Sequence, residues 1–225
     1  MRNLVIVLCL VLVAAVAQAG VISDLQQGMY AIGDEITVTN AIVTGATYNG
    51  CFITELPVGP YSGVWVYLGS GHTIVDGDVV NITGLYEEYY DLTEINASGG
   101  MYEVVGNGPV PAAYPVTAAE FNLDSEPFEG VAICITDGLT VTVAPNSYGE
   151  WFAASVETAD EIMFDDFWYD DTTVTEAQCF NYACGPVYYS FGAYKLEAWA
   201  DGIEVVDCSV PTDASSLTEI KAMFR

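Results

Sequence analysis

Residues 77–95 read GDVVNITGLYEEYYDLTEI, and residues 183–199 read ACGPVYYSFGAYKLEAW. Each stretch has a glycine near its start, then aromatic residues, a bend and a second run that alternates apolar and polar residues. This period-2 pattern around a tight turn predicts a β-hairpin. The same hairpin is therefore predicted twice in one chain.

The two hairpins align without gaps when Gly84 is placed on Gly185, an offset of 101 residues. Tyr90 then corresponds to Phe191 at the turn. Because this offset is about the length of one small domain, the sequence predicts one β-barrel that occurs twice. The alternative is two unrelated aromatic hairpins in a single all-β protein.

Strand patterns fill the chain from residue 34 onward, apart from residues 106–126, which contain three prolines. Before this break, five strand patterns are separated by turn signals such as Asn49-Gly50 and Asp76-Gly77. Short strands at such close spacing predict a small closed barrel. We expect a signal peptide at 1–19, a first barrel at 20–106, a linker at 107–126, a second barrel at 127–208 and a C-terminal tail at 209–225.

The first residues have the pattern of a secretory signal peptide. Arg2 precedes an apolar run, and Ala17-Gln18-Ala19 forms a cleavage signature, so we expect cleavage after Ala19. The apolar run is short for a membrane span, and the alternative is an uncleaved anchor. No later segment is long and apolar enough to span a bilayer. We therefore expect a secreted protein, extracellular or periplasmic, with no membrane span in its mature form.

The chain is very acidic, with 31 Asp and Glu residues against four Lys and Arg. All the carboxylates follow residue 19, whereas Arg2 precedes it, so the formal charge after cleavage is −28. Affinity for nucleic acid comes largely from Lys and Arg, so a nucleic-acid ligand is not expected. The same charge repels anionic lipid headgroups.

Five cysteines follow the predicted cleavage site, so at least one of them is unpaired. An exported protein can form disulfides. Cys179 and Cys184 are separated by four residues, and we predict a disulfide that closes a small loop between them. Cys134 lies in the apolar run VAIC, where we expect a small buried apolar side chain.

The order of these patterns resembles the OB-fold domains found in secreted bacterial nucleases and related extracellular phosphoesterases. The first half carries TVTNAIVTG, GCFITE and SGVWVYLG before the hairpin of residues 77–95. The family's strand pattern, GD-V-x-V-x-G followed by E-Y-x-x-x-T-x-I, is matched by Gly77, Asp78, Val80, Ile82, Gly84, Glu88, Tyr89, Thr93 and Ile95. The second half is similar to the companion repeat. The resemblance spans most of residues 30–207 and implies an all-β fold of two tandem small OB-like β-barrels, to which the tail adds a short C-terminal helix.

In that family the OB repeats are accessory, and catalysis belongs to a separate endonuclease/exonuclease/phosphatase domain. This chain matches only the accessory repeats, so the resemblance implies that the protein is not an enzyme. It also implies an alternative function, in which the chain presents substrate to, or regulates, a separate extracellular nuclease or phosphoesterase.

Aromatic residues concentrate on the matched hairpins: Tyr86, Tyr89, Tyr90, Tyr188, Tyr189, Phe191 and Tyr194. OB-folds use rings on a barrel face to stack bases or sugars. A sugar suits an acidic surface better than a nucleic acid does. The alternative is that these rings fill a core. The sequence thus predicts a secreted, non-enzymatic binding or assembly module that recognises an extracellular glycan or protein partner through its barrel faces.

FDDFWYDD, at residues 164–171, places four carboxylates around aromatic residues. The candidate oxygen ligands for Ca²⁺, the one cofactor that the sequence suggests, are Asp165, Asp166, Asp170 and Asp171. The EF-hand spacing is missing. The alternative is a strand end with solvated aspartates, from which Phe164, Phe167 and Trp168 pack inward.

The tail contains Ser216-Leu-Thr-Glu219, a capping-box pattern that predicts a short helix. Lys221 and Arg225 follow, where the end of a helix favours positive charge. The tail is a candidate docking or sorting segment, and the alternative is a frayed terminus.

Overall fold

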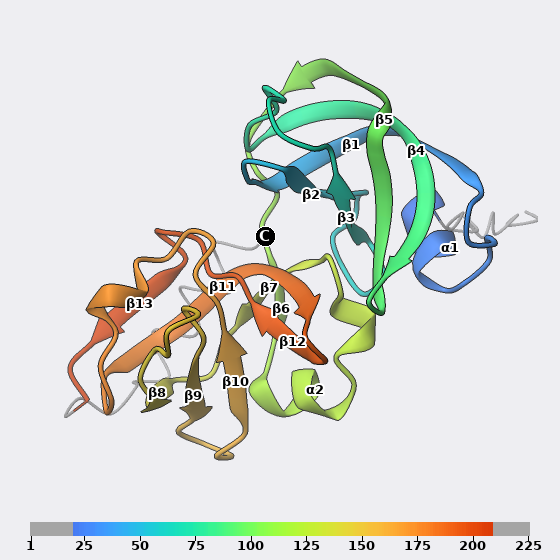
Figure 1. The fold of residues 1–225 in the computed structure, drawn as a ribbon. Helices are drawn as coiled ribbons and strands as arrows, with labels where there is room; N and C mark the ends of the chain where they lie inside the picture. Colours follow the sequence, from blue (N-terminus) through green and yellow to red (C-terminus); the bar gives the residue numbers. More distant parts are fainter. Residues whose placement is uncertain (1–19, 209–225) are drawn as a thin grey trace, which may run out of the picture.

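The computed structural model describes residues 20–208, so the predicted signal peptide and C-terminal helix lie outside the described residues. Within that range the protein is all-β apart from two short α-helices and two 3-10 turns, and the predicted fold class is confirmed. Figure 1 shows two lobes, the first coloured blue to green and the second yellow to red. No helix of residues 20–208 has the length and hydrophobicity of a membrane span.

The first lobe is a closed barrel of five strands. These are β1 (Glu35–Ala46), β2 (Gly50–Thr54), β3 (Gly63–Tyr67), β4 (Asp78–Tyr89) and β5 (Leu92–Asn107). The strand order is β1-β2-β3-β5-β4, and β4 pairs with β1 to close the barrel. Neighbouring strands are antiparallel except β3 and β5, which are parallel. The first lobe is therefore a small closed all-β barrel.

The second lobe repeats this order. Its strands are β6 (Tyr114–Val116), β7 (Ala132–Ile135), β8 (Leu139–Val143), β9 (Trp151–Ser155), β10 (Glu161–Phe164), β11 (Cys179–Ser190), β12 (Ala193–Leu196) and β13 (Ile203–Val206). The strands β8-β9-β10-β12-β11 form a ring that closes where β11 pairs with β8. The one parallel pair of the ring joins β10 and β12, the counterparts of β3 and β5. Since β7 pairs with the far part of β11, β7 and β8 together correspond to the single long strand β1.

The gapless alignment of the two hairpins holds in three dimensions. A Cβ atom on Gly84 would lie 2.6 Å from the carbonyl oxygen of Asn96, so the backbones of β4 and β5 need a glycine there. A Cβ atom on Gly185 would collide with the carbonyl oxygen of Glu197, which is 101 residues after Asn96. Both hairpins therefore make the same close contact at matched positions.

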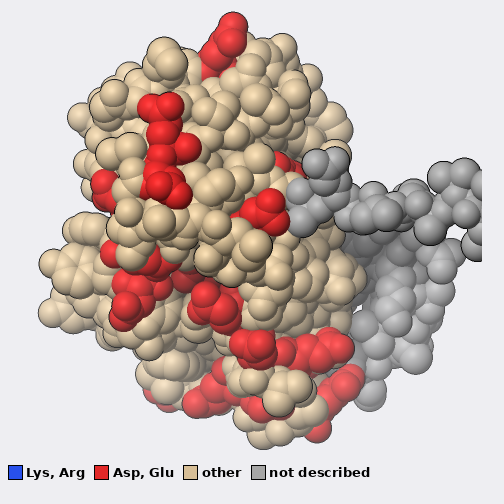
Figure 2. All heavy atoms as spheres, turned by 90° about the vertical axis from the view of Figure 1, so that its right-hand side faces the viewer, with Lys and Arg blue, Asp and Glu red and all other residues tan. Residues whose placement is uncertain are grey.

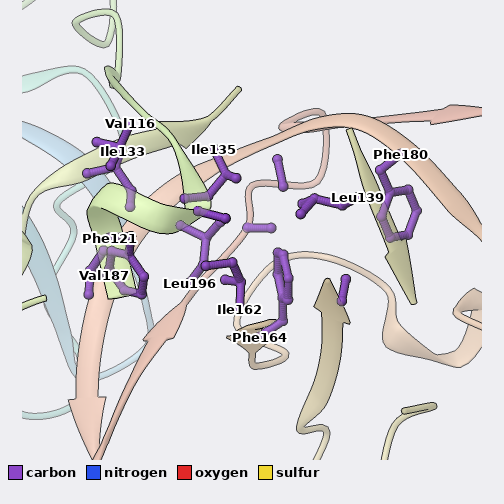
Figure 3. Packing of buried hydrophobic residues seen from close by; sticks show 14 of the residues in the cluster. Val116, Phe121, Ile133, Ile135, Leu139, Ile162, Phe164, Phe180, Val187 and Leu196 are labelled. Carbon is purple, nitrogen blue, oxygen red and sulfur yellow. The ribbon is translucent and has the colours of Figure 1, made fainter. Parts of the chain in front are cut away.

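A short helix packs against the core of each barrel. In the first, α1 (Val21–Gln26) buries Ile22 and Leu25. In the second, α2 (Ala118–Leu123) buries Phe121, which Figure 3 shows among residues of the surrounding strands. Each structural repeat is thus a helix followed by a barrel. We did not predict α1, because six residues are too few for a helical period to emerge.

Part of the predicted linker belongs to the second lobe. Within residues 107–126, β6 pairs with β7 in parallel, and α2 packs on the core of that lobe. Thr117 and Glu120 form a capping box at the start of α2. The connection between the lobes is therefore shorter than the linker that the prolines predicted.

The structure pairs Cys134 with Cys184 and Cys179 with Cys208, so the predicted Cys179–Cys184 disulfide is wrong. Cys179 and Cys184 both lie on β11, five residues apart. In an extended strand this separation is roughly 16 Å, too far for a disulfide. Cys134 is buried, as predicted, but lies opposite Cys184 on the neighbouring strand. The free cysteine of residues 20–208 is Cys51, which is buried.

The lobes are joined by hydrogen bonds as well as by the chain. Glu129, just before β7, accepts a hydrogen bond at Oε1 from the Thr93 N–H of β5, at 2.9 Å. Its backbone oxygen accepts a second bond from the Gln26 side chain of α1, at 3.1 Å. The Glu129 carboxyl is buried, and its Oε2 atom has no partner among the described residues. Burial, and then the nearby Glu126 and Glu88, raise the pKa of Glu129 to about 8.

We predict that the free energy of unfolding falls as the pH rises from 5 to 9. A carboxyl whose pKa is raised in the folded state binds its proton more tightly there than in the unfolded chain, where the pKa of Glu is about 4.3. The stabilisation is complete below that value and is lost as the pH passes the folded pKa. Glu94, with a pKa raised to about 7 by burial and then by Glu87, acts in the same direction.

The measurement is urea unfolding at pH 5, 7 and 9. We expect a loss on the order of a few kcal/mol between the extremes. Glu129→Gln, which cannot ionise, should reduce the slope between pH 7 and 9. Stability that is constant or rises over this range would contradict the assignment of a protonated Glu129.

Candidate functional site: a groove between the lobes

The tips of the two matched hairpins meet at one groove of about 1260 Å³, which we call the inter-lobe groove. Tyr90-Asp91 forms the tip of the first hairpin and Phe191-Gly192 the tip of the second. Nine aromatic residues line the groove: Tyr48, Trp65, Tyr89, Tyr90, Phe167, Trp168, Tyr188, Tyr189 and Phe191. The volume exceeds the roughly 300–1,000 Å³ of most small-molecule sites.

The floor of the groove is a cluster of rings from both lobes. Trp65 of β3 and Tyr188 of β11 have ring centroids 5.5 Å apart, and Phe52 of β2 lies 5.9 Å from Tyr188. These edge-to-face contacts hold the lobes together. Trp65 is buried, so only a small part of its surface reaches the groove. Burial, and then the nearby Glu94, raise the pKa of Tyr188 to about 12, so its hydroxyl keeps its proton and can donate a hydrogen bond.

The rim carries aromatic side chains that are open to solvent. Phe191 is 97% exposed and Tyr90 is 79% exposed. Both have positive φ angles, of 52° and 53°, as the first residues of their turns. Large aromatic residues rarely adopt this conformation, which costs on the order of 1–3 kcal/mol. Exposure and strain at two matched positions are unfavourable for folding alone, and they point to a role in binding.

We expect Phe191→Asn to stabilise the protein. The turn becomes Asn-Gly, the pair that is preferred where both central residues have positive φ. The gain should be about 0.5–1 kcal/mol, or roughly 1–4 °C in Tm, by thermal unfolding. Tyr148→Asn is the control, because Tyr148 is exposed but its φ is not positive. A lower Tm for Phe191→Asn than for wild type would show that Phe191 is retained for stability.

The loop after β10 supplies a wall of the groove. Trp168 donates a hydrogen bond from Nε1 to the carbonyl oxygen of Ala46 on β1, at 3.2 Å. Its ring lies so close to Gly45 that a Cβ atom there would be 2.5 Å from the indole. Phe167 is held through its backbone N–H, which donates to the buried carboxyl of Glu197 at 3.3 Å. The loop is thus fixed to both lobes.

Asp165 and Asp166 add carboxylates to the same wall. Asp165 accepts a hydrogen bond at 2.9 Å from Lys195 Nζ, which also contacts Glu150 at 2.5 Å. Burial, and then the neighbouring Asp165, raise the pKa of Asp166. Asp166 is exposed, so its oxygens are open to ligand hydroxyl groups.

The predicted Ca²⁺ site is wrong. Asp165 is neutralised by Lys195, and Asp170 accepts from Thr172 as the cap of a 3-10 turn. Asp165, Asp166, Asp170 and Asp171 therefore do not converge, and within residues 20–208 no cluster of three or more such side chains could hold a metal ion. Of the three rings that the alternative places inward, Phe164 is buried and Trp168 is partly buried against Phe52 and Trp65, whereas Phe167 is exposed. Phe167 and Trp168 both line the groove.

The groove has no positive charge among its described residues. Lys195 is the one Lys or Arg of residues 20–208, and it is buried. Figure 2 shows a face on which carboxylates spread over both lobes and no Lys or Arg of the described chain is visible. Such a surface repels phosphate groups.

Five of the seven aromatic residues predicted to bind ligand line the groove: Tyr89, Tyr90, Tyr188, Tyr189 and Phe191. Tyr86 does not, because it points into the first barrel, where it is 6% exposed and donates to Glu88. Tyr194 also lies outside the groove, and its hydroxyl bonds Glu126. Tyr86 lies within β4, whereas Tyr90 is the first residue of the turn that follows it. Strand alternation therefore does not place the two side chains on one face.

The sequence patterns did not indicate four of the nine groove aromatics as binding residues: Tyr48, Trp65, Phe167 and Trp168. Tyr48 precedes the turn signal Asn49-Gly50, so its exposure could have been foreseen. Trp65 reaches the groove through the packing of one lobe on the other, for which the sequence has no local signal. A comparison with known proteins found no matching family model and no matching curated protein.

Proposed function

We propose that this chain is an exported, non-enzymatic binding module that recognises a neutral glycan in the inter-lobe groove. The observation that carries the proposal is the meeting of two matched, exposed aromatic tips over one groove whose described lining residues include carboxylates and no Lys or Arg. Aromatic faces stack on the apolar faces of sugar rings, and carboxylates accept hydrogen bonds from sugar hydroxyls. OB-like barrels provide such sites for oligosaccharides.

The chemistry of the groove favours this ligand over the other candidates. A nucleic acid, or a polyanionic glycan, would bring negative charge to Asp91 and Asp166, whereas Asp165 is already paired with Lys195. A role as an accessory to a separate extracellular nuclease or phosphoesterase remains the alternative proposal, and it rests on the family resemblance alone.

A glycan array, run beside a salt-titrated oligonucleotide assay, tests the proposal. We expect retention of neutral saccharides that changes little with salt, and no measurable binding of single-stranded DNA or RNA. Strongly salt-sensitive oligonucleotide binding, with no saccharide retained, would overturn it.

A further inference from the structure

A second cavity adjoins the inter-lobe groove and shares Trp168 with it. This adjoining pocket has a volume of about 480 Å³. Trp199, Tyr182, Asp76 and Asp201 line it together with Trp168. The connection between the lobes supplies part of its wall, at residues 110–113.

Two tryptophans of the second lobe are fixed along one strand of the first. Trp199 Nε1 donates to the carbonyl oxygen of Thr44 at 2.9 Å, and Trp168 Nε1 donates to that of Ala46. Thr44 and Ala46 lie two residues apart near the end of β1, where the strand register shifts between Val43 and Gly45. The two indoles are therefore anchored in succession along the end of β1. Because both N–H groups are already bonded, the rings have only their carbon surfaces to offer a ligand.

The adjoining pocket has the same chemistry as the groove. It combines aromatic rings with the exposed carboxylates Asp76 and Asp201, and no Lys or Arg is among its described lining residues. Asp76 also accepts a hydrogen bond from the Ala46 N–H at 2.7 Å. This bond fixes the end of β1, to which Trp168 is hydrogen-bonded through the Ala46 carbonyl oxygen. The aromatic surface thus continues from the hairpin tips past Trp168 to Trp199.

We infer that the groove and the adjoining pocket are successive subsites for one extended, neutral oligosaccharide, with Trp168 between them. This inference rests on the proposed function and adds the length of the ligand to it. A single sugar would use only part of the aromatic surface.

An extended peptide is the competing occupant, because aromatic grooves also bind proline-rich segments. A peptide backbone needs donors as well as acceptors from its site. The two indole N–H groups are already used within the protein, and the charged groups of both cavities are acceptors. The charged groups are acceptors only, whereas the donors of the groove are neutral, such as the Tyr188 hydroxyl and the Asn49 amide, and this balance favours a ligand rich in hydroxyl groups, which both donate and accept.

The test measures affinity against ligand length, on an array of neutral glycans that contains each sugar as a dimer and as oligomers up to eight units. We expect wild-type affinity to rise at least tenfold from dimers to hexamers. Trp199→Leu should abolish this rise and leave dimer affinity within twofold of wild type. Because Trp199 also contacts the first lobe, Asp201→Asn is a second variant on an exposed side chain, with an expected three- to fivefold loss for hexamers only. Tyr148→Leu, outside both cavities, is the matched control.

Affinity that does not depend on length, or equal losses for dimers and hexamers in both variants, would overturn the inference and leave the proposed function intact. If a proline-rich peptide binds and no saccharide does, the inference of an oligosaccharide ligand is wrong and the two cavities bind a protein partner. Failure of all saccharides and peptides to bind would overturn the proposed function as well.

Discussion

Tyr90→Ala combined with Phe191→Ala is expected to lower saccharide affinity about 100-fold or more without unfolding the protein. Loss of one ring stacked on a base costs roughly 1–3 kcal/mol, and we expect a similar cost for a ring stacked on a sugar. The double variant removes a ring from each side of the groove. Both side chains are exposed, so their removal leaves no cavity in either core. Isothermal titration calorimetry with the strongest array ligand measures the loss.

Tyr148→Ala is the control for this pair, because Tyr148 is 78% exposed and does not line the groove. Its affinity should equal that of wild type. Each single tip variant should lose about tenfold, because the two tips contact the ligand from different lobes. If the double variant binds the saccharide as tightly as wild type does, the hairpin tips do not contact the ligand.

Lys195→Met is expected to destabilise the protein by about 3–5 kcal/mol, because it leaves two poorly solvated carboxylates without their cation. Burial alone would lower the pKa of Lys195, but its hydrogen bonds to Glu150 and Asp165 outweigh burial and raise it, so the amine is charged. The same change releases Asp165 from the wall of the groove, so saccharide affinity should also fall. Denaturant unfolding at pH 7 measures the first effect.

The triple variant Lys195→Met, Glu150→Gln, Asp165→Asn separates charge from packing. Because it removes the unpaired charges, it should recover most of the stability that Lys195→Met loses. If the single variant is as stable as wild type, the buried ion pairs contribute nothing. If the triple variant is no better than the single one, the loss comes from packing of the lysine side chain.

The repeat was readable from the sequence because its decisive contacts are local. Gly84 and Gly185 are needed for a close approach within one hairpin, and strand alternation around each turn gives the pairing. The sequence did not show that β7 and β8 together correspond to the single strand β1. This correspondence depends on which strands pair with β11, and such pairing is not a local feature of the sequence.

The site was only partly readable for the same reason. Exposed rings at a hairpin tip, such as Tyr90 and Phe191, follow from the turn pattern. Trp65, Trp168 and Trp199 join the two cavities only after one lobe packs on the other. The cysteine prediction failed similarly, because sequence proximity does not show that Cys179 and Cys184 share one extended strand.

The central claim is that a saccharide lies between the two hairpin tips, and backbone-amide NMR of the labelled protein tests it most directly. On titration with the strongest neutral oligosaccharide, we predict that the largest shift changes fall at residues 47–49, 89–92, 165–168 and 188–192. Changes confined to other surfaces, such as the exposed end of β5 at residues 98–107, would contradict the claim.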